Sequence, residues 1–183
     1  MTTPSPIAEV RASLTADRER LREAVDRVPA RARETKPAPD RWSTAEVLEH
    51  LALIETRVVM MLGPLVRTAP SMEADPAPGT PPFDRAPLLN RQTRVEAPPQ
   101  IQPTGTVSSA DAWASLQNTR AQLLTLLDTV DAERRDLTQV SRQHPVLGPL
   151  DGYQWIAAVG GHEARHALQI LEIATTIERE ETR

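Results

Sequence analysis

The sequence predicts an all-α protein, a four-helix bundle that forms a single domain over residues 1–183. Apolar residues recur at intervals of three, four and seven in four separate segments, which is the pattern of amphipathic helices. Helix-capping residues precede three of these segments. No segment shows the alternation of apolar and polar residues that predicts a strand, and no internal repeat is present.

The first two helices have clear apolar stripes. The first is expected to stop at Pro29, because proline lacks a backbone N–H and clashes with the preceding turn. The second begins with Ser43 and Glu46, a capping box in which each side chain bonds to a free backbone N–H of the first turn. Gly63 and Pro64 are expected to end or kink it. The stripes consist of Ile7, Val10, Leu14, Leu21, Val25 and Val28 in the first helix and of Val47, Leu51, Ile54, Val58, Leu62 and Leu65 in the second.

The third and fourth helices have start signals of the same kind. Ser108 with Asp111 begins the third helix, and Asp151 with Gln154 begins the fourth. Residues 134–150, between these two helices, are expected to be irregular. The stripes consist of Trp113, Leu116, Leu123, Leu127 and Val130 in the third helix and of Trp155, Val159, His162, His166, Ile170, Ile173 and Ile177 in the fourth.

A proline-rich connection at about residues 67–107 separates the second helix from the third. Nine prolines fall between residues 70 and 103, so no helix is expected there. Two interpretations remain open. The connection is either a plain crossover on the surface, which is the more common case, or a lid or partner-binding arm.

Composition and charge exclude several classes of function. The chain has 21 basic and 25 acidic residues and a net charge of −4, which argues against a nucleic-acid-binding protein. Its five aromatic residues are too few for a platform that stacks single-stranded bases. Cysteine is absent, which excludes disulfides and thiolate ligands. The chain shows neither a signal peptide nor a membrane-spanning segment, so a cytoplasmic protein without a membrane partner is expected.

Three of the four histidines fall on apolar stripes. His162 and His166 are four residues apart, so about 40° of rotation and roughly 6 Å of rise separate them on one helix face. His50 lies on the stripe of the second helix, and a bundle that packs the second helix on the fourth can bring the three imidazoles together. Three neutral imidazoles suit Zn²⁺, Ni²⁺ or Fe²⁺ and leave a coordination position for water or substrate. The alternative is that all three are hydrogen-bonded core histidines.

Residues near this cluster have separate interpretations. Glu163 is turned by about 100° from His162, so we expect it to be neither a ligand nor the general base. Arg165 and Gln169 either orient the ligands or bind an anionic substrate group, or they form hydrogen bonds between helices, Arg165 with Glu46 or Glu49. His144 precedes a proline in the irregular segment and is left out of the metal set. It is interpreted as a turn residue, a substrate contact or a structural hydrogen-bonding group.

Three segments resemble the DinB-like (YfiT-like) superfamily of metal-dependent four-helix-bundle proteins. The segment from Trp42 to Leu51 resembles its W-S-x-x-E-V-L-x-H-L motif, and the segment from His144 to Gly148 resembles its H-P-x-x-G turn. The segment from Trp155 to Ile170 resembles its W…H-E-x-R-H-x-x-Q-I motif. The resemblance implies an up-down-down-up bundle with a long crossover after the second helix, and a metal site at His50, His162 and His166. Members with an assigned chemistry include thiol-dependent S-transferases and a mycothiol-dependent isomerase.

One feature of the fourth helix departs from this pattern. Gly160 and Gly161 directly precede His162 and cost roughly 2 kcal/mol relative to alanines in a continuous helix. Either they open space beside the metal or allow a local distortion of the helix, or they let helix one or helix three approach closely.

Two functional hypotheses follow. The first is a metal-dependent enzyme in which the three-histidine site activates water or an external low-molecular-weight thiol, for hydrolysis of a small-molecule substrate or transfer to it. The second is a non-enzymatic bundle with a structural metal or none, which acts as a stress-related binding or dimerisation module, for example as a homodimer.

Overall fold

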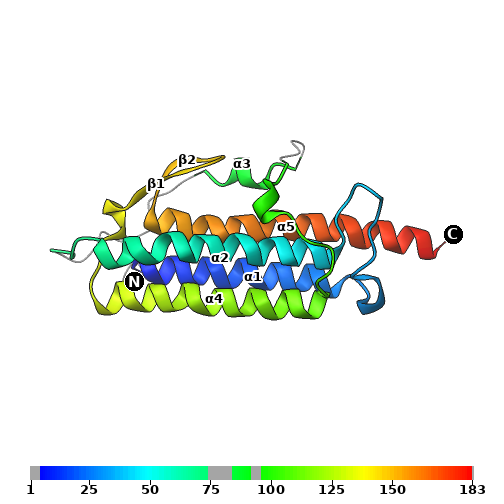
Figure 1. Cartoon of the computed structure of the whole chain (residues 1–183), viewed down its shortest axis with the longest axis horizontal. Helices are drawn as coiled ribbons and strands as arrows, with labels where there is room; N and C mark the ends of the chain where they lie inside the picture. The colour runs from blue at the N-terminus through cyan, green and yellow to red at the C-terminus, as the bar shows by residue number, and fades with distance from the viewer. Residues whose placement is uncertain (1–4, 74–83, 92–95, 183) are drawn as a thin grey trace, which may run out of the picture.

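The computed structural model describes residues 5–73, 84–91 and 96–182, in which four long helices form a bundle (Figure 1). The helices are α1 (Pro6–Asp26), α2 (Thr44–Thr68), α4 (Ser109–Ala132) and α5 (Gly152–Glu181). α1 packs along α5 and α2 along α4, and α2 also contacts α5. In Figure 1, α1 and α5 run in one direction while α2 and α4 run in the other. The predicted four-helix bundle with up-down-down-up topology is therefore confirmed.

The predicted capping residues begin these helices. Ser43 and Glu46 form a complete capping box at the start of α2, with Ser43 N donating to Glu46 Oε2 at 2.8 Å. Asp151 and Gln154 form a second complete box at the start of α5. Ser108 Oγ accepts from the backbone N–H of Asp111 at the start of α4.

Pro64 does not end α2, which continues to Thr68, so of the two expected outcomes at this position, an end or a kink, the end is wrong. Two features favour continuation. Gly63 has no Cβ to clash with the proline ring, and Val66 is buried in the core beyond the proline. Burial of this last turn offsets the hydrogen bond that the proline cannot donate.

The connection from the end of α2 to the start of α4, residues 69–108, is called the crossover here. Since α2 and α4 are parallel, the crossover returns along the bundle. Its described parts contain a short helix α3 (Ala86–Leu89) and a 3-10 turn η2 (Pro99–Ile101). The expectation that no helix forms between residues 70 and 103 is wrong for these two turns. Pro87 and Pro99 each lie in the first turn, where the missing N–H costs nothing.

A two-stranded antiparallel hairpin precedes α5, so the prediction that the chain lacks strands is wrong. β1 (Ser141–His144) pairs with β2 (Gly148–Asp151), and Gly148 takes the left-handed conformation with φ of +78°. β1 is mostly exposed, so its residues lack the alternating apolar pattern that predicts a strand.

Two large apolar clusters, separated by a layer of charges, form most of the core, and a third, small cluster contains Leu88, Leu150 and Ala158. The cluster at the hairpin end contains Leu14, Val58, Leu123 and Val159, and the cluster at the opposite end contains Leu21, Leu51, Leu116 and Ala167. Between the two lie Arg18, Glu55, Arg120 and Glu163, one from each long helix.

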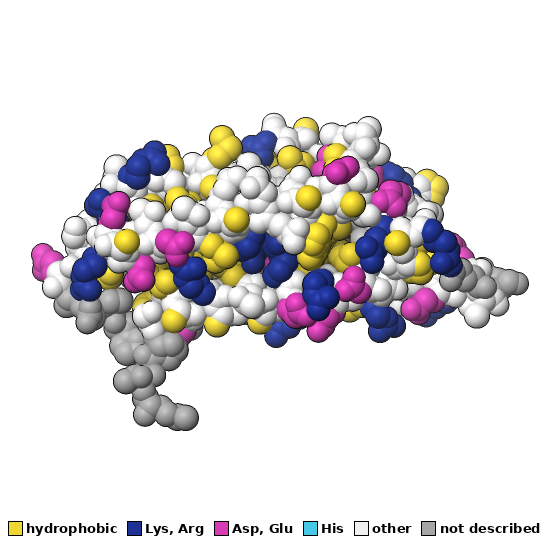
Figure 2. All heavy atoms as spheres, turned by 90° about the horizontal axis from the view of Figure 1, so that it is seen from below, with side chains coloured by type: hydrophobic (Ala, Val, Ile, Leu, Met, Phe, Trp, Pro, Cys, Tyr) yellow, Lys and Arg dark blue, Asp and Glu magenta, His cyan; other side chains and the backbone are white. Residues whose placement is uncertain are grey.

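The outer surface carries charges of both signs. On the face shown in Figure 2, basic and acidic side chains are interspersed, and neither sign forms a single field. Among the described residues, no helix combines the length and apolar character needed to cross a lipid bilayer.

Candidate metal centre

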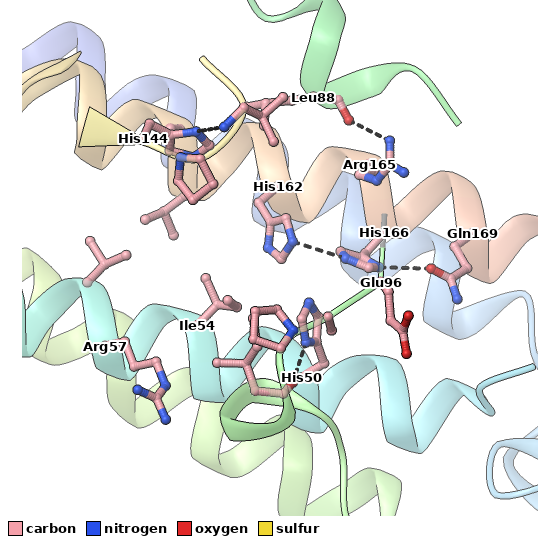
Figure 3. A pocket seen from close by; sticks show the side chains of 18 of the residues that line it. His50, Ile54, Arg57, Leu88, Glu96, His144, His162, Arg165, His166 and Gln169 are labelled. Carbon is pink, nitrogen blue, oxygen red and sulfur yellow. Dashed lines mark hydrogen bonds between the residues drawn. The ribbon is translucent and has the colours of Figure 1, made fainter. Parts of the chain in front are cut away.

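The structure brings His50, His162 and His166 together between α2 and α5 (Figure 3). One ring nitrogen from each lies within 4.8 Å of the other two. His162 Nε2 and His166 Nε2 are 3.1 Å apart. The ring centroid of His50 lies 5.2 Å from that of His162 and 5.0 Å from that of His166. The helix spacing and the packing of α2 on α5 produce the cluster that the sequence predicts.

Hydrogen bonds fix the orientation of two of these rings. His50 Nδ1 donates to the carbonyl of Ile101 at 2.6 Å, and His166 Nδ1 donates to Gln169 Oε1 at 2.9 Å. An imidazole that carries its proton on Nδ1 has a lone pair on Nε2. Both rings therefore present Nε2 as an acceptor. Such an outer hydrogen bond is the usual way a metal-binding histidine is held in one tautomer.

The donor set fits a divalent ion. Two imidazole nitrogens bound at about 2.0–2.1 Å to one tetrahedral ion lie about 3.3 Å apart, close to the observed separation of His162 and His166. Burial lowers the pKa of His50, lowers that of His162 to about 3 and lowers that of His166 well below its usual value. All three rings are therefore neutral at neutral pH, the state in which imidazole binds metal.

The three histidines line a pocket of about 910 Å³, which is within the size range of small-molecule sites. α2 and α5 form two of its walls, the hairpin turn lies at one end, and described parts of the crossover lie over it. Trp42 contacts the ring of His50, with the centroids 4.9 Å apart. Leu88 of α3 is buried against α5.

His144 lies at the end of β1, outside the three-histidine cluster but in the wall of the same pocket. Its Nδ1 accepts the backbone N–H groups of Val146 at 3.1 Å and Leu147 at 3.2 Å, which closes the hairpin turn. Its ring packs on Trp155, with the centroids 4.8 Å apart. His144 therefore is a structural turn residue that also faces the pocket, which agrees with its omission from the metal set.

Arg165 contacts the crossover rather than α2. Its Nη1 donates to the carbonyls of Leu88, at 3.0 Å, and Asn90. The predicted bond from Arg165 to Glu46 or Glu49 is wrong, because Arg165 turns to the face of α5 that α3 covers. Glu49 instead accepts from the backbone N–H and hydroxyl of Thr104 in the crossover. Gln169 accepts a hydrogen bond from His166 and orients its ring, which agrees with the interpretation that Gln169 orients a histidine of the cluster.

Glu163 points away from the histidines into the charged layer. Its Oε1 accepts from Arg18 Nε at 2.8 Å, and its Oε2 lies 3.0 Å from Arg120 Nη2. The same two arginines pair with Glu55, at 3.0 Å from Arg18 and 2.6 Å from Arg120. The expectation that Glu163 is not a ligand agrees with this position. Sequence analysis missed the layer, although four charged residues on otherwise apolar stripes were a usable signal.

The two glycines of α5 allow close approaches. A Cβ on Gly160 would lie 2.6 Å from Oδ2 of Asp17 in α1, and a Cβ on Gly161 would lie 2.9 Å from Cδ1 of Leu88 in the crossover. The interpretation that helix one approaches here is therefore supported. The neighbour of Gly161 is the crossover and not helix three.

Comparisons with known proteins agree with this fold. The family model of the DinB superfamily matches residues 13–170, so the chain belongs to the DinB superfamily. A curated relative, the uncharacterized protein YuaE of Bacillus subtilis (strain 168), is 33% identical over 145 residues, covering 79% of this chain and 84% of the relative. The crystal structure of TT2238, a four-helix bundle protein, has a TM-score of 0.56 and 22% identity and covers 91% of this chain and 98% of its own. This second likeness supports the fold alone.

Proposed function

We propose that this chain is a metal-dependent enzyme in which His50, His162 and His166 bind Zn²⁺, Ni²⁺ or Fe²⁺. The observation that supports the proposal is the arrangement of the three rings, whose nitrogens lie within 4.8 Å of one another in the wall of a pocket of about 910 Å³. An ion held there would lower the pKa of a bound water or thiol, or polarise a bound oxygen. The predicted reaction class is transfer to a small electrophile or its hydrolysis.

The chain's own residues orient two of the three histidines. The carbonyl of Ile101 and the side-chain oxygen of Gln169 keep His50 and His166 in the tautomer that presents Nε2. Because three histidines leave one or more coordination positions open, the site suits chemistry better than a closed structural role. The chain has no cysteine, so a thiol substrate would come from a separate small molecule.

The first experiment measures metal content per chain by mass spectrometry after loading with Zn²⁺, Ni²⁺ or Fe²⁺. We expect about one ion per chain in the parent protein and none in His50→Ala and His162→Ala. Retention of stoichiometric metal by either variant would reject the site. If the parent protein binds no ion, the histidines are core residues and the enzyme proposal is wrong.

The second experiment separates an enzyme from a bundle with a structural metal. The loaded protein is assayed for hydrolysis of p-nitrophenyl acetate and for substitution of an activated aryl chloride by cysteine, in which a C–S bond replaces the C–Cl bond and chloride and a proton are released. Turnover that is lost in His162→Ala supports the enzyme. Loss of melting temperature in that variant, without turnover in the parent protein, favours the binding or dimerisation module.

A further inference from the structure

One arm of the pocket is apolar and leads away from the histidines. Two stripes of side chains line it, one on α2 and one on α5, and the hairpin turn lies at its far end. Ile54, on the α2 stripe, lies in the gap between the two helices beside His50 (Figure 3). The apolar lining residues of the arm are Ile54, Val58 and Met61 from α2, Ala158, Val159 and Trp155 from α5, and Pro145 and Val146 from the turn. Two polar side chains, Arg57 of α2 and His144 beside the turn, also line the pocket.

The apolar stripes of α2 and α5 both lead from the histidines toward the hairpin end of the bundle. α2 and α5 are antiparallel, so Met61, which follows His50 in α2, and Trp155, which precedes His162 in α5, both lie toward the hairpin (Figure 1). At 1.5 Å of rise per residue, Met61 lies about 16 Å along the helix from His50. The arm is therefore continuous with the histidine cluster and long enough for an extended hydrocarbon group.

The opposite end of the pocket has a different character. Arg91 donates two hydrogen bonds to Glu172, at 2.7 and 2.8 Å, and Arg165 bonds to carbonyls of the crossover. These bonds hold the crossover on α5 and engage Nε and Nη2 of Arg91 and Nη1 of Arg165. The apolar arm is left as the space for the body of a ligand, and apolar pockets with few polar groups favour apolar ligands.

We infer that the apolar arm binds the hydrocarbon chain of a small amphipathic ligand whose polar end lies at the histidine cluster. The inference rests on the proposed function only for the polar end of the ligand, which would bind the metal held by the histidines. The chain of the ligand would lie between α2 and α5 and replace water against Ile54, Val58 and Met61. The substrate class is thus a small molecule with one metal-binding polar group and an alkyl chain, rather than a uniformly charged metabolite.

The test uses alkyl hydroxamates of increasing length as probes, because the hydroxamate group chelates metal and the chain reports on the arm. Acetohydroxamate, butanohydroxamate, hexanohydroxamate and octanohydroxamate are titrated calorimetrically into zinc-loaded protein. Affinity is expected to rise about three- to fourfold for each buried methylene group. Longer chains that bind no more tightly than acetohydroxamate would overturn the inference.

Two neighbouring methionines provide matched variants. Met61 lines the arm and is half-buried, whereas Met60 is 71% exposed and lies outside the pocket. Met61→Gln should weaken octanohydroxamate at least fivefold and leave acetohydroxamate unchanged, which also shows that the variant is folded. Met60→Gln should change neither. Equal effects of the two substitutions on octanohydroxamate would contradict the assignment of the arm.

A third measurement separates failure of the arm from failure of the metal site. The same series is titrated into metal-free protein, where chelation cannot contribute. A chain-length dependence that persists there supports the arm, even if zinc adds nothing and the proposed enzyme is wrong. A flat series in both forms rejects the arm, whatever affinity acetohydroxamate gains from zinc.

Discussion

Asp17 Oδ2 lies 2.7 Å from Nη2 of Arg85, an ion pair that joins the middle of α1 to the crossover. Asp17 is 1% exposed, and its other oxygen accepts from Arg20 Nη1 at 2.7 Å. The pair forms next to Gly160 of α5, where the absence of a side chain leaves room for the carboxylate. The packing of α1 on α5 is therefore coupled to the position of the crossover over the pocket.

Gly160→Ala is expected to destabilise the protein. Alanine favours a helix over glycine by about 1 kcal/mol, but its Cβ would lie 2.6 Å from Oδ2 of Asp17, a buried carboxylate whose Oδ2 accepts from Arg85 and whose Oδ1 accepts from Arg20. Overpacking of this kind costs about 1–3 kcal/mol, which the helix gain reduces to a net loss of up to about 2 kcal/mol in urea denaturation. A variant about 1 kcal/mol more stable than the parent protein would show that Asp17 moves aside without cost.

Gly161→Ala is expected to act on the crossover instead. Its Cβ would meet the end of the Leu88 side chain, at 2.9 Å, and Arg85 Nε, at 3.3 Å, both of which can move with the crossover. Global stability should change by less than about 1 kcal/mol, because the helix gain offsets the displaced contact. Limited digestion with trypsin should cut faster after Arg85 and Arg91 than in the parent protein. Unchanged cleavage would show that close packing at Gly161 does not hold the crossover against α5.

The buried charged layer gives a prediction with a control on the same helix. Glu163→Gln leaves Arg18 and Arg120 with one carboxylate, Glu55, and a net buried positive charge. Loss of one member of a buried ion pair costs about 3–5 kcal/mol, and we expect a loss of about 3 kcal/mol in chemical denaturation.

The matching control is Glu178→Gln, also in α5. Glu178 is 54% exposed and pairs with Arg27 at 3.5 Å on the surface, so the change should cost less than about 1 kcal/mol. Similar losses in the two variants would mean that the charged layer contributes no more than a surface ion pair.

Long-range periodicity explains why the sequence predicts the four helices and the histidine cluster. A helix imposes a repeat on its buried face, so the positions of His50, His162 and His166 could be read directly. The packing of α2 on α5, which brings them together, followed only from the family resemblance. The capping residues of α2 and α5 are local signals and were correctly interpreted.

The features that the sequence did not predict either lack a periodic pattern or depend on contacts between distant residues. The hairpin is of the first kind, because β1 is mostly exposed and each strand has only four residues, and its stability comes from pairing and from the turn at His144. The partners of Arg165 and the neighbour of Gly161 lie in the crossover, whose path no local pattern determines. The same limit applies to the charged layer, in which Glu163 and Arg18 are far apart in the chain.

His144 provides a test of which histidines belong to the site. His144→Asn should keep the turn, because an asparagine side-chain oxygen can accept the same backbone N–H groups, whereas His144→Ala should lose about 1 kcal/mol of stability. Both variants should retain about one zinc ion per chain by mass spectrometry, since His144 lies outside the cluster of three. Loss of zinc from His144→Asn, with melting temperature unchanged, would make His144 a fourth ligand.

Gln169 is a positioning residue whose effect should be measurable without an activity assay. Its Oε1 accepts from His166 Nδ1 at 2.9 Å and so keeps Nε2 of that ring free to bind metal. Gln169→Ala should lower zinc affinity by about 10- to 100-fold in competition with a chelator, the usual effect of removing such a partner. Gln169→Glu supplies another acceptor and should restore the affinity, although it also places a carboxylate near Arg91. If Gln169→Ala and Gln169→Glu weaken zinc equally, the orientation of His166 depends on packing, and the hydrogen bond to Gln169 does not position the ring.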